Sequence, residues 1–212
     1  MPPTKPSSPR GRPPSITRAR IADAGIAIGL PQVTFVGVAT ALGVSHMALY
    51  KHVSGLAALK HLIAEEIFQR WELPRAPEAE QGTLQDYMQV FIASVQAFVK
   101  AHPGVTPYVI RRVVATPAML DKIDAHQSHI AQAYGMQKEQ ARWLLATVTF
   151  NCIAAADTVY AAVDRGPETD ASREMEEGEL EAEFAQGMQA LVAGALAMLE
   201  LPGSQKTQRR TR

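Results

Sequence analysis

Apolar residues recur every three or four positions along most of the chain, which is the period of an amphipathic α-helix. Leu59, Ile63, Ile67 and Trp71 follow one another at four-residue spacing, and a longer stripe of the same kind runs through residues 84–99. No segment of useful length alternates apolar and polar residues, and the sequence contains no Asn-Gly or Asp-Gly hairpin turn. The pattern therefore predicts an all-α fold.

Cap residues and helix breakers divide this pattern into about nine helices. Serine or threonine stands where several of them begin, and glycine or proline stands where most of them end. Short helices come first and longer helices follow. The predicted helices span residues 17–28, 34–42, 45–53, 55–71, 84–101, 105–114, 116–134, 137–164 and 180–200.

Prolines and basic residues mark the boundaries of the predicted domains. Residues 1–14 contain six prolines and have little apolar surface to bury, so we expect a disordered basic arm. Pro74 and Pro77 interrupt the helical pattern and predict a linker over residues 72–82. The other predicted parts are an N-terminal domain over residues 15–71, a C-terminal domain over residues 83–201 and a basic tail over residues 202–212.

The composition, 47% hydrophobic and 20% charged, is that of a soluble globular protein. The single cysteine excludes an internal disulfide framework and a cysteine-rich zinc module. The sequence has no run of eighteen apolar residues and no apolar signal core at its N-terminus. We therefore expect a cytoplasmic protein that does not span a membrane.

The formal net charge of +0 conceals an uneven distribution. Residues 1–60 hold seven basic residues and one acidic residue, a net charge of +6, and the last seven residues add four basic ones. Residues 61–205 hold 10 basic and 20 acidic residues, a net charge of −10. A basic front on an acidic body favours a nucleic-acid contact at one end, although solvated surface charge without a partner would give the same distribution.

The most informative segment is residues 34–53, TFVGVATALGVSHMALYKHV. It has the pattern of two short helices joined by a tight turn, in which Gly43 permits a positive φ and Ser45 caps the second helix. Such a pair is the layout of a helix-turn-helix, whose second helix enters the major groove of DNA by its N-terminal end. The expected shared core consists of Val38, Ala39, Leu42, Val44 and Leu49.

The outer face of the second helix carries the candidate DNA contacts. His46 and Met47 come first and are the candidates for base contact, and Ala48 would pack against a thymine methyl group. Tyr50 and Lys51 are expected to meet phosphates, which position the protein but do not read sequence. The residues that begin the three short helices are also assigned to the DNA interface: Thr17, Thr34 and Ser45.

These residues resemble the TetR family of bacterial transcription regulators. The resemblance covers about residues 15–71 and implies a three-helix helix-turn-helix domain, followed by a helical domain that binds a ligand and dimerises. Beyond these residues only the architecture is similar, and a helix-turn-helix of another family is the alternative. The matching residues are Val38-Ala39, Gly43-Val44-Ser45 and Leu49-Tyr50 followed by His52, with Thr17-Arg18, Ile21 and Asp23-Ala24 in the preceding helix.

The sequence departs from the family pattern where phosphates are contacted. Leu56 stands where family members usually carry a lysine that meets a phosphate, so this side-chain contact is lost, although the amide groups of the helix start could still bind a phosphate. The basic arm offers a replacement, because Pro9-Arg10-Gly11-Arg12-Pro13 resembles the core of an AT-hook, in which two arginines enter a narrow A·T minor groove. We therefore expect Arg10 and Arg12 to bind DNA. The alternative is a solvated arm with only a general attraction to phosphate.

By the same resemblance, a ligand pocket lies within the C-terminal domain. Thr147 and Asn151 stand four residues apart on one helix face, so they would offer two polar groups to a mostly apolar ligand. An ordinary hydrophobic core would show the same apolar and aromatic spacing, which is the alternative. The candidate lining residues are Met88, Phe91, Ile92, Met119, Ile123, His126, Trp143, Thr147, Phe150 and Asn151.

Two of the predicted helices, 137–164 and 180–200, carry many small residues. Small residues let helices approach closely, so these two helices of each of two chains are expected to form a four-helix homodimer interface. Close packing within one chain is the alternative. The small residues are Ala154, Ala155, Ala156, Ala161 and Ala162 on the first helix and Gly187, Ala190, Ala193, Gly194, Ala195 and Ala197 on the second.

No other motif points to chemistry. His126 and His129 stand three residues apart, but no carboxylate-plus-histidine pattern completes a metal site, and Cys152 is expected to be a buried apolar residue. The Gly-x-Ser-x-Gly, Gly-x-Gly-x-x-Gly, phosphate-loop and His-Glu-x-x-His motifs are all missing from the sequence. We therefore expect no metal, no cofactor and no enzymatic activity.

The expected function is that of a ligand-responsive transcription regulator. It would be a homodimeric repressor that a small, mostly apolar effector releases from a palindromic operator in double-stranded DNA. Two alternatives stay open on the sequence. One is an architectural DNA-binding factor that needs no small ligand, and the other is an all-α enzyme.

Overall fold

The computed structural model describes residues 16–77, 82–110, 112–162 and 170–200. Within these ranges the chain forms nine α-helices, two short 3-10 helices and no β-strand, which confirms the all-α fold. In chain order the elements are α1 (Arg18–Ile28), η1 (Leu30–Gln32), α2 (Phe35–Leu42), α3 (His46–Leu49), α4 (Leu56–Arg70), α5 (Leu84–Ala101), α6 (Thr106–Val109), η2 (Arg112–Val114), α7 (Pro117–Ala133), α8 (Lys138–Ala162) and α9 (Asp170–Glu200).

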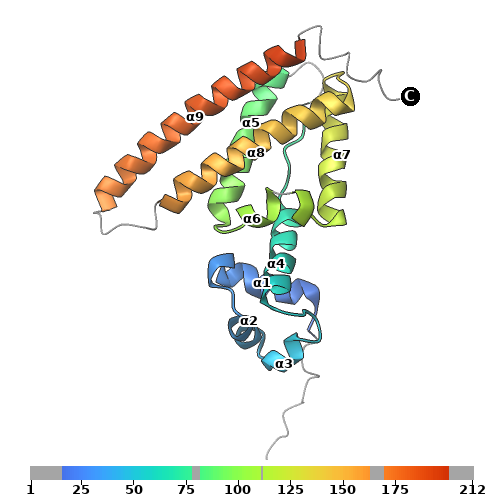
Figure 1. Ribbon diagram of the computed structural model, residues 1–212, viewed down its shortest axis with the longest axis vertical. Coiled ribbons are helices and arrows are strands. Elements are labelled where there is room, and N and C mark those ends of the chain that lie inside the picture. Colours follow the sequence, from blue (N-terminus) through green and yellow to red (C-terminus); the bar gives the residue numbers. More distant parts are fainter. Residues whose placement is uncertain (1–15, 78–81, 111, 163–169, 201–212) are drawn as a thin grey trace, which may run out of the picture.

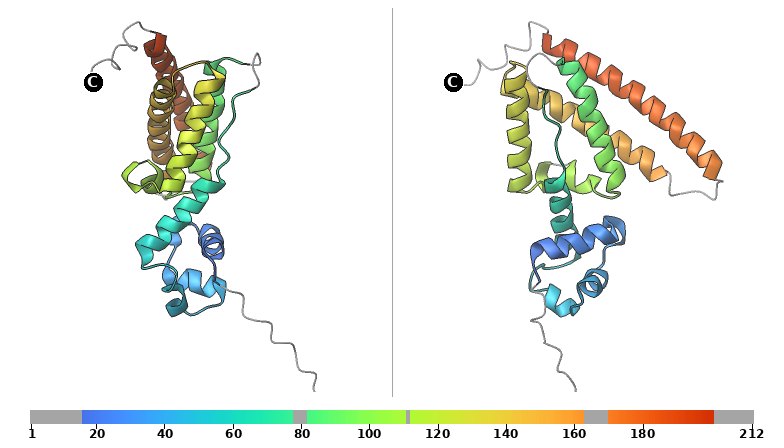
Figure 2. Two further views of the ribbon diagram at one scale, coloured as in Figure 1. Left: turned by 90° about the vertical axis from the view of Figure 1, so that its right-hand side faces the viewer. Right: turned by 180° about the vertical axis from the view of Figure 1, so that it is seen from behind.

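The helices form two parts that α4 joins (Figure 1). The helices α1, α2 and α3 make a small unit at one end of the molecule, and α5, α7, α8 and α9 form the larger body, with α6 at its base. The views in Figure 2 show α4 rising from the small unit to the body, where the two longest helices, α8 and α9, lie side by side. The two parts are therefore connected by a single continuous helix.

Local capping explains why the small unit folds as the sequence predicts. Thr17, Thr34 and Ser45 each accept the backbone N–H of the residue three positions later, at 3.2, 3.0 and 3.2 Å. Gly43 follows α2 in the left-handed conformation, with a φ of 68°, as the tight turn requires. These caps confirm the helix-turn-helix formed by α2 and α3.

The core of the small unit is closed by α4. Ile21 of α1, Val38 of α2 and Leu49 of α3 are fully buried. Leu59 and Ile63, from the first two turns of α4, are buried against them. Burial of one such side chain contributes about 1.5–3 kcal/mol, so apolar packing holds α4 firmly to the small unit.

Three predicted helices differ in length from those observed. The second helix of the helix-turn-helix ends at Leu49, and residues 50–52 continue as turns rather than as helix to residue 53. The predicted helix 105–114 divides into α6 and η2. The last helix begins at Asp170 rather than at residue 180, because the polar stretch before 180 is rich in glutamate, a good helix former, although it has no apolar stripe.

The segment between α4 and α5 has no regular secondary structure over residues 71–77 and runs along the body, where Tyr87 and His129 bond the backbone of Pro74 and Ala76. The next helix, α5, starts with a capping box, in which Thr83 and Asp86 each bond the backbone N–H of the other. The predicted arm over residues 1–14 and the predicted tail over residues 202–212 lie outside the described residues.

Gly25 provides a test of the packing between α1 and α4. A Cβ atom at this position would lie 2.5 Å from Cγ1 of Ile63, whose side chain is fully buried. We expect Gly25→Ala to lower the free energy of unfolding by about 1–3 kcal/mol through overpacking, as measured by urea denaturation.

The matched control for this experiment is Gly178→Ala in α9, where nothing lies within 4 Å of the added Cβ. The same exchange should raise the free energy of unfolding there by about 0.5–1 kcal/mol, because glycine is a poor helix residue. A Gly25→Ala protein as stable as the wild type would contradict the tight packing of α1 on α4.

Candidate functional site

The helix α3 lies at the end of the molecule that is farthest from α8 and α9 (Figure 1). Leu49 is buried and fixes this helix against the core, whereas Met47 is 64% exposed and Tyr50, just after the helix, is 49% exposed. The face of α3 that is predicted to meet DNA is therefore open to solvent. Its other candidate residues are exposed or half-buried: His46, Ala48 and Lys51.

An aromatic stack holds one of these side chains in place. The ring of Tyr50 stacks on Phe35 of α2, with the ring centroids 4.4 Å apart and the planes at 19°. Sequence reasoning missed Phe35 because the two residues lie on different elements, so no helical periodicity relates them. The stack makes Phe35 a positioning residue for the exposed face of α3.

The remaining DNA-binding candidates lie at helix starts or in the arm. Thr17 and Thr34 are exposed at the beginnings of α1 and α2. Leu56, which is 45% exposed, opens α4 directly after Gly55, and no side chain caps this helix. Arg10 and Arg12 lie outside the described residues.

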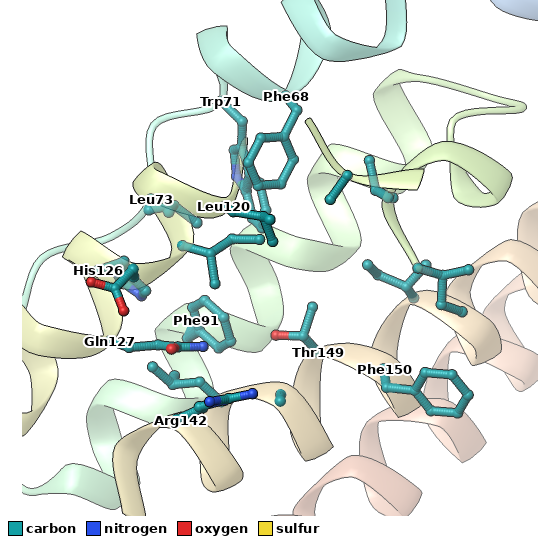
Figure 3. A pocket seen from close by; sticks show the side chains of 18 of the residues that line it. Phe68, Trp71, Leu73, Phe91, Leu120, His126, Gln127, Arg142, Thr149 and Phe150 are labelled. Atoms are coloured by element: carbon teal, nitrogen blue, oxygen red, sulfur yellow. The ribbon is translucent and has the colours of Figure 1, made fainter. Parts of the chain in front are cut away.

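A cavity of about 440 Å³ lies in the body beside the end of α4 (Figure 3). Phe68 of α4 and Trp71, the residue after it, line one side of the cavity. Phe91 and Phe98 line it from α5, and residues of α7 and α8 complete the wall. The cavity therefore touches the same helix that closes the core of the small unit.

Four of the ten residues predicted to line a pocket line this cavity: Phe91, Ile123, His126 and Phe150. Three others belong to the body but do not line the cavity, because they pack between helices. These are Met88 and Met119, which are fully buried, and Ile92, which is half-buried.

The last three predicted residues lie on another side of α8. Trp143, Thr147 and Asn151 do not line the cavity, and Asn151 donates a hydrogen bond to the carbonyl of Thr147 at 2.9 Å. Because successive helix residues are about 100° apart, Trp143 lies roughly a quarter of a turn from the centre of the lining face, and Thr147 and Asn151 lie still farther round the helix. The lining face of α8 consists of Arg142, Leu145, Ala146, Thr149, Phe150 and Ile153.

Polar groups lie on the side of the cavity opposite Phe68 and Trp71. Gln127 of α7 and Arg142 of α8 lie there together, and Thr149 points into the space between the two sides (Figure 3). In the described part of the chain, these three side chains form no hydrogen bond or ion pair with protein groups. The cavity thus offers aromatic walls and unpaired polar groups, which suits a largely apolar ligand with hydrogen-bonding atoms at one edge.

His126 is a neutral member of the cavity wall. The Tyr87 hydroxyl lies 3.2 Å from the carbonyl of Pro74 and forms a 2.9 Å hydrogen bond with Nε2 of His126, whose direction depends on the imidazole tautomer. Burial first, and the nearby His129 and Lys122 second, lower the pKa of His126 to about 4. The imidazole is therefore uncharged at neutral pH.

The two histidines have separate hydrogen-bond partners within the protein. His129 accepts the backbone N–H of Ala76 at 3.2 Å, while His126 bonds Tyr87. No group of three or more histidine, cysteine or acidic side chains is placed to hold a metal within the described ranges. Cys152 is fully buried, and burial raises the pKa of its thiol to about 12, which makes it unreactive.

The long helices α8 and α9 leave apolar faces exposed. Trp143 and Phe150 of α8 are 38% and 57% exposed. On α9, Ala195 is buried within the chain, whereas the other five predicted small residues are exposed: Gly187, Ala190, Ala193, Gly194 and Ala197. Ala156 of α8 is likewise buried, and Ala161 and Ala162 lie outside the residues whose side chains are described.

By length and composition, two stretches of these helices are apolar enough to cross a membrane. They are residues 138–160 and 178–199, each with a mean hydropathy of 1.2 over its most apolar window. Of these windows, 39% in α8 and 22% in α9 are buried in the molecule. An open face of this kind is also what a second copy of the chain would cover.

The neutral state of His126 has a consequence for stability. The unfolded chain takes up a proton on histidine near pH 6.5, whereas folded His126 does so near pH 4. The free energy of unfolding should therefore fall as the pH drops from 6.5 to 4, and His126→Gln should flatten this dependence. Urea denaturation at several pH values measures it. The exposed His46→Gln is the control, and an equal slope in His126→Gln and wild type would assign the effect to other groups.

No protein-family model matches the sequence, and no curated protein does so either. Solved structures do match the fold. A TetR variant from Acinetobacter baumannii AYE, in complex with minocycline, has a TM-score of 0.67 at 19% identity, covering 87% of this chain and 98% of that chain. ActR from Streptomyces coelicolor, in complex with (S)-DNPA, has a TM-score of 0.62 at 19% identity, with coverage of 87% and 98%. SCO7222, a TetR from Streptomyces coelicolor, has a TM-score of 0.57 at 20% identity, with coverage of 86% and 99%. The chain therefore has the fold of the TetR-family regulators.

Proposed function

We propose that this protein is a ligand-responsive transcription regulator of the TetR type, a homodimeric repressor that a small molecule releases from its operator. The observation that carries the proposal is the placement of α4. Leu59 and Ile63 of this helix are buried in the core behind α3, and Phe68 at its other end lines the cavity. An occupant of the cavity thus touches the helix that supports the DNA-binding unit.

The DNA-binding roles follow from exposure and order along α3. His46 and Met47 come first on the exposed face and are proposed to contact bases, with Ala48 against a thymine methyl group. Tyr50, held by Phe35, and Lys51 are proposed to contact phosphates, together with the helix starts at Thr17, Thr34 and Ser45. Arg10 and Arg12 are proposed to enter the adjacent minor groove.

The cavity supports a planar, mostly apolar effector. Its volume of about 440 Å³ and its aromatic residues fit a molecule of several rings, and Gln127, Thr149 and Arg142 would bond polar atoms at one edge. Two of the similar solved structures are complexes with small molecules: the Acinetobacter TetR variant with minocycline and ActR with actinorhodin.

The exposed faces of α8 and α9 are proposed to form the dimer interface, within residues 137–164 and 180–200. Ala190, Ala193 and Ala197 would allow a close approach of the partner helix, and Trp143 and Phe150 would be covered. A two-fold dimer presents two copies of α3, so its operator would be an inverted repeat with half-sites about one helical turn apart, or a little more.

Substitutions on α3 and just after it distinguish residues that contact bases from residues that contact phosphates. The operator is first selected from a random-sequence DNA pool. His46→Ala or Met47→Ala should then change the preference for the contacted base pair, with a loss of about 1–3 kcal/mol in discrimination against the wrong base. Lys51→Ala should weaken all sequences alike and reduce the salt dependence of binding. Fluorescence anisotropy measures each affinity. Altered base preference in Lys51→Ala alone would reverse these assignments.

The dimer interface is tested by placing a charge on the exposed face of α9. Ala190→Arg should produce monomers with much weaker operator binding, because an arginine would be buried unpaired between helices. Light scattering after size-exclusion chromatography gives the mass. The matched control is Ala93→Arg, at an exposed alanine of α5, which should remain dimeric. A dimeric Ala190→Arg protein would place the interface elsewhere.

A further inference from the structure

The end of α4 lacks the usual helix-terminating residue. The last residue, Arg70, is followed by Trp71 in an extended conformation, with φ −64° and ψ 118°, and not by a glycine in the left-handed conformation. The last carbonyl groups of a helix have no partners within the helix and need them from elsewhere. The backbone N–H of Trp71 bonds the carbonyls of Ile67 and Phe68, and a residue of another helix supplies further donors.

That residue is Lys122 of α7. Its Nζ donates to the carbonyls of Phe68 at 3.1 Å, Gln69 at 2.7 Å and Trp71 at 2.5 Å. The same ammonium group lies 5.7 Å from the centroid of the Phe68 ring. A cation is favoured here because the C-terminal end of a helix carries a partial negative charge. We call this set of three hydrogen bonds the Lys122 clamp.

The clamp lies directly behind the cavity wall. Phe68 and Trp71, two of the residues whose carbonyls it holds, line the cavity with their side chains, and so do Asp121 and Ile123 on either side of Lys122. A molecule in the cavity that moves these side chains relative to α7 must also strain the clamp. The clamp is half-buried, and burial lowers the pKa of the lysine.

From the clamp, the path to the DNA-binding unit is short. Arg70 pairs with Asp23 of α1 at 2.6 Å, so the end of α4 is bonded to the first helix of the small unit. A second link runs from the body through Glu65 of α4, which accepts from Thr116 at 3.1 Å and lies 3.6 Å from Arg18. The clamp differs from this link because Phe68 and Trp71, whose carbonyls it holds, themselves line the cavity.

We propose that Lys122 is the positioning residue that couples occupancy of the cavity to the orientation of the DNA-binding unit, an inference that rests on the proposed function. The lysine touches neither DNA nor the cavity lumen. It acts by making the end of α4 and the cavity wall of α7 move together. Its loss should therefore reduce the coupling between the two sites rather than the binding at either one.

A tethered occupant tests the proposal without knowledge of the natural effector. Thr149→Cys places a thiol in the cavity for reaction with monobromobimane, while buried Cys152, the one native cysteine, stays unlabelled. Intact-mass spectrometry confirms a single label. Operator affinity, on DNA selected by the wild-type protein, is then compared before and after labelling, with and without Lys122→Met.

Labelling should weaken operator binding of the Thr149→Cys protein by about 5–150-fold, the usual range of allosteric coupling. In Thr149→Cys with Lys122→Met the loss should fall below about 2-fold, and Lys122→Arg should restore part of it, because a guanidinium group can also donate to several carbonyls. The matched control is Lys138→Met, at a lysine that pairs with Asp124 and does not reach α4. Thr149→Cys combined with Lys138→Met should lose as much operator affinity on labelling as Thr149→Cys alone.

The possible failures are distinguishable. An equal loss of affinity with and without Lys122→Met would overturn the role of Lys122, even if that substitution lowered the melting temperature. No effect of labelling in the protein that retains Lys122 would overturn the cavity as an effector site, and with it the proposed function. The labelled and unlabelled forms of each variant are compared with each other, so a general loss of stability does not imitate a loss of coupling.

Discussion

The packing of α4 at its two ends is the constraint on which the rest of the structure depends. At one end, Ile63 fills the space that Gly25 leaves open on α1. At the other end, Phe68 and Trp71 join Phe98 in an aromatic cluster, with Trp71 stacked on Phe98 at 4.5 Å between centroids. Close-packed interfaces do not deform gradually, so a displacement of one end of the helix is transmitted to the other.

The polar contacts around α4 differ in how strongly they restrain this helix. The ion pairs of Arg70 with Asp23 and Glu66 are solvent-exposed, and such pairs contribute about 0–1 kcal/mol each. The bonds of Lys122 lie in a half-buried junction, where a polar group without a partner costs about 1–3 kcal/mol. The half-buried lysine therefore restrains the end of α4 more strongly than the exposed pairs do.

One helix of the body, α8, has faces in three different environments. Leu144, Val148 and Cys152 are buried in the core, Thr149 and Ile153 face the cavity, and the side that carries Trp143 is open. Because alanine is common along this helix, its apolar positions do not form one narrow stripe. The faces of α8 are distinguished only by the elements that pack against them. On its inner side these elements are α5, α7 and α9.

The sequence by itself determined the features that depend on neighbouring residues. The caps at Thr17, Thr34 and Ser45 and the turn at Gly43 involve residues three or four positions apart, so their types and spacing were sufficient to predict the all-α fold and the helix-turn-helix. Phe91, Ile123, His126 and Phe150, which were among the ten residues that the family resemblance suggested for a pocket, line the cavity.

Only the tertiary structure decided which side of α8 faces the cavity, how Phe35 holds Tyr50, and that Lys122 closes the end of α4. Each of these features joins residues on different helices. Lys122 and the carbonyl of Gln69 are 53 positions apart, and a backbone carbonyl has no signature in the sequence. A lysine on an amphipathic helix is typical of a solvated face. Its role here arises from the way α7 meets α4, which depends on the packing of the whole body.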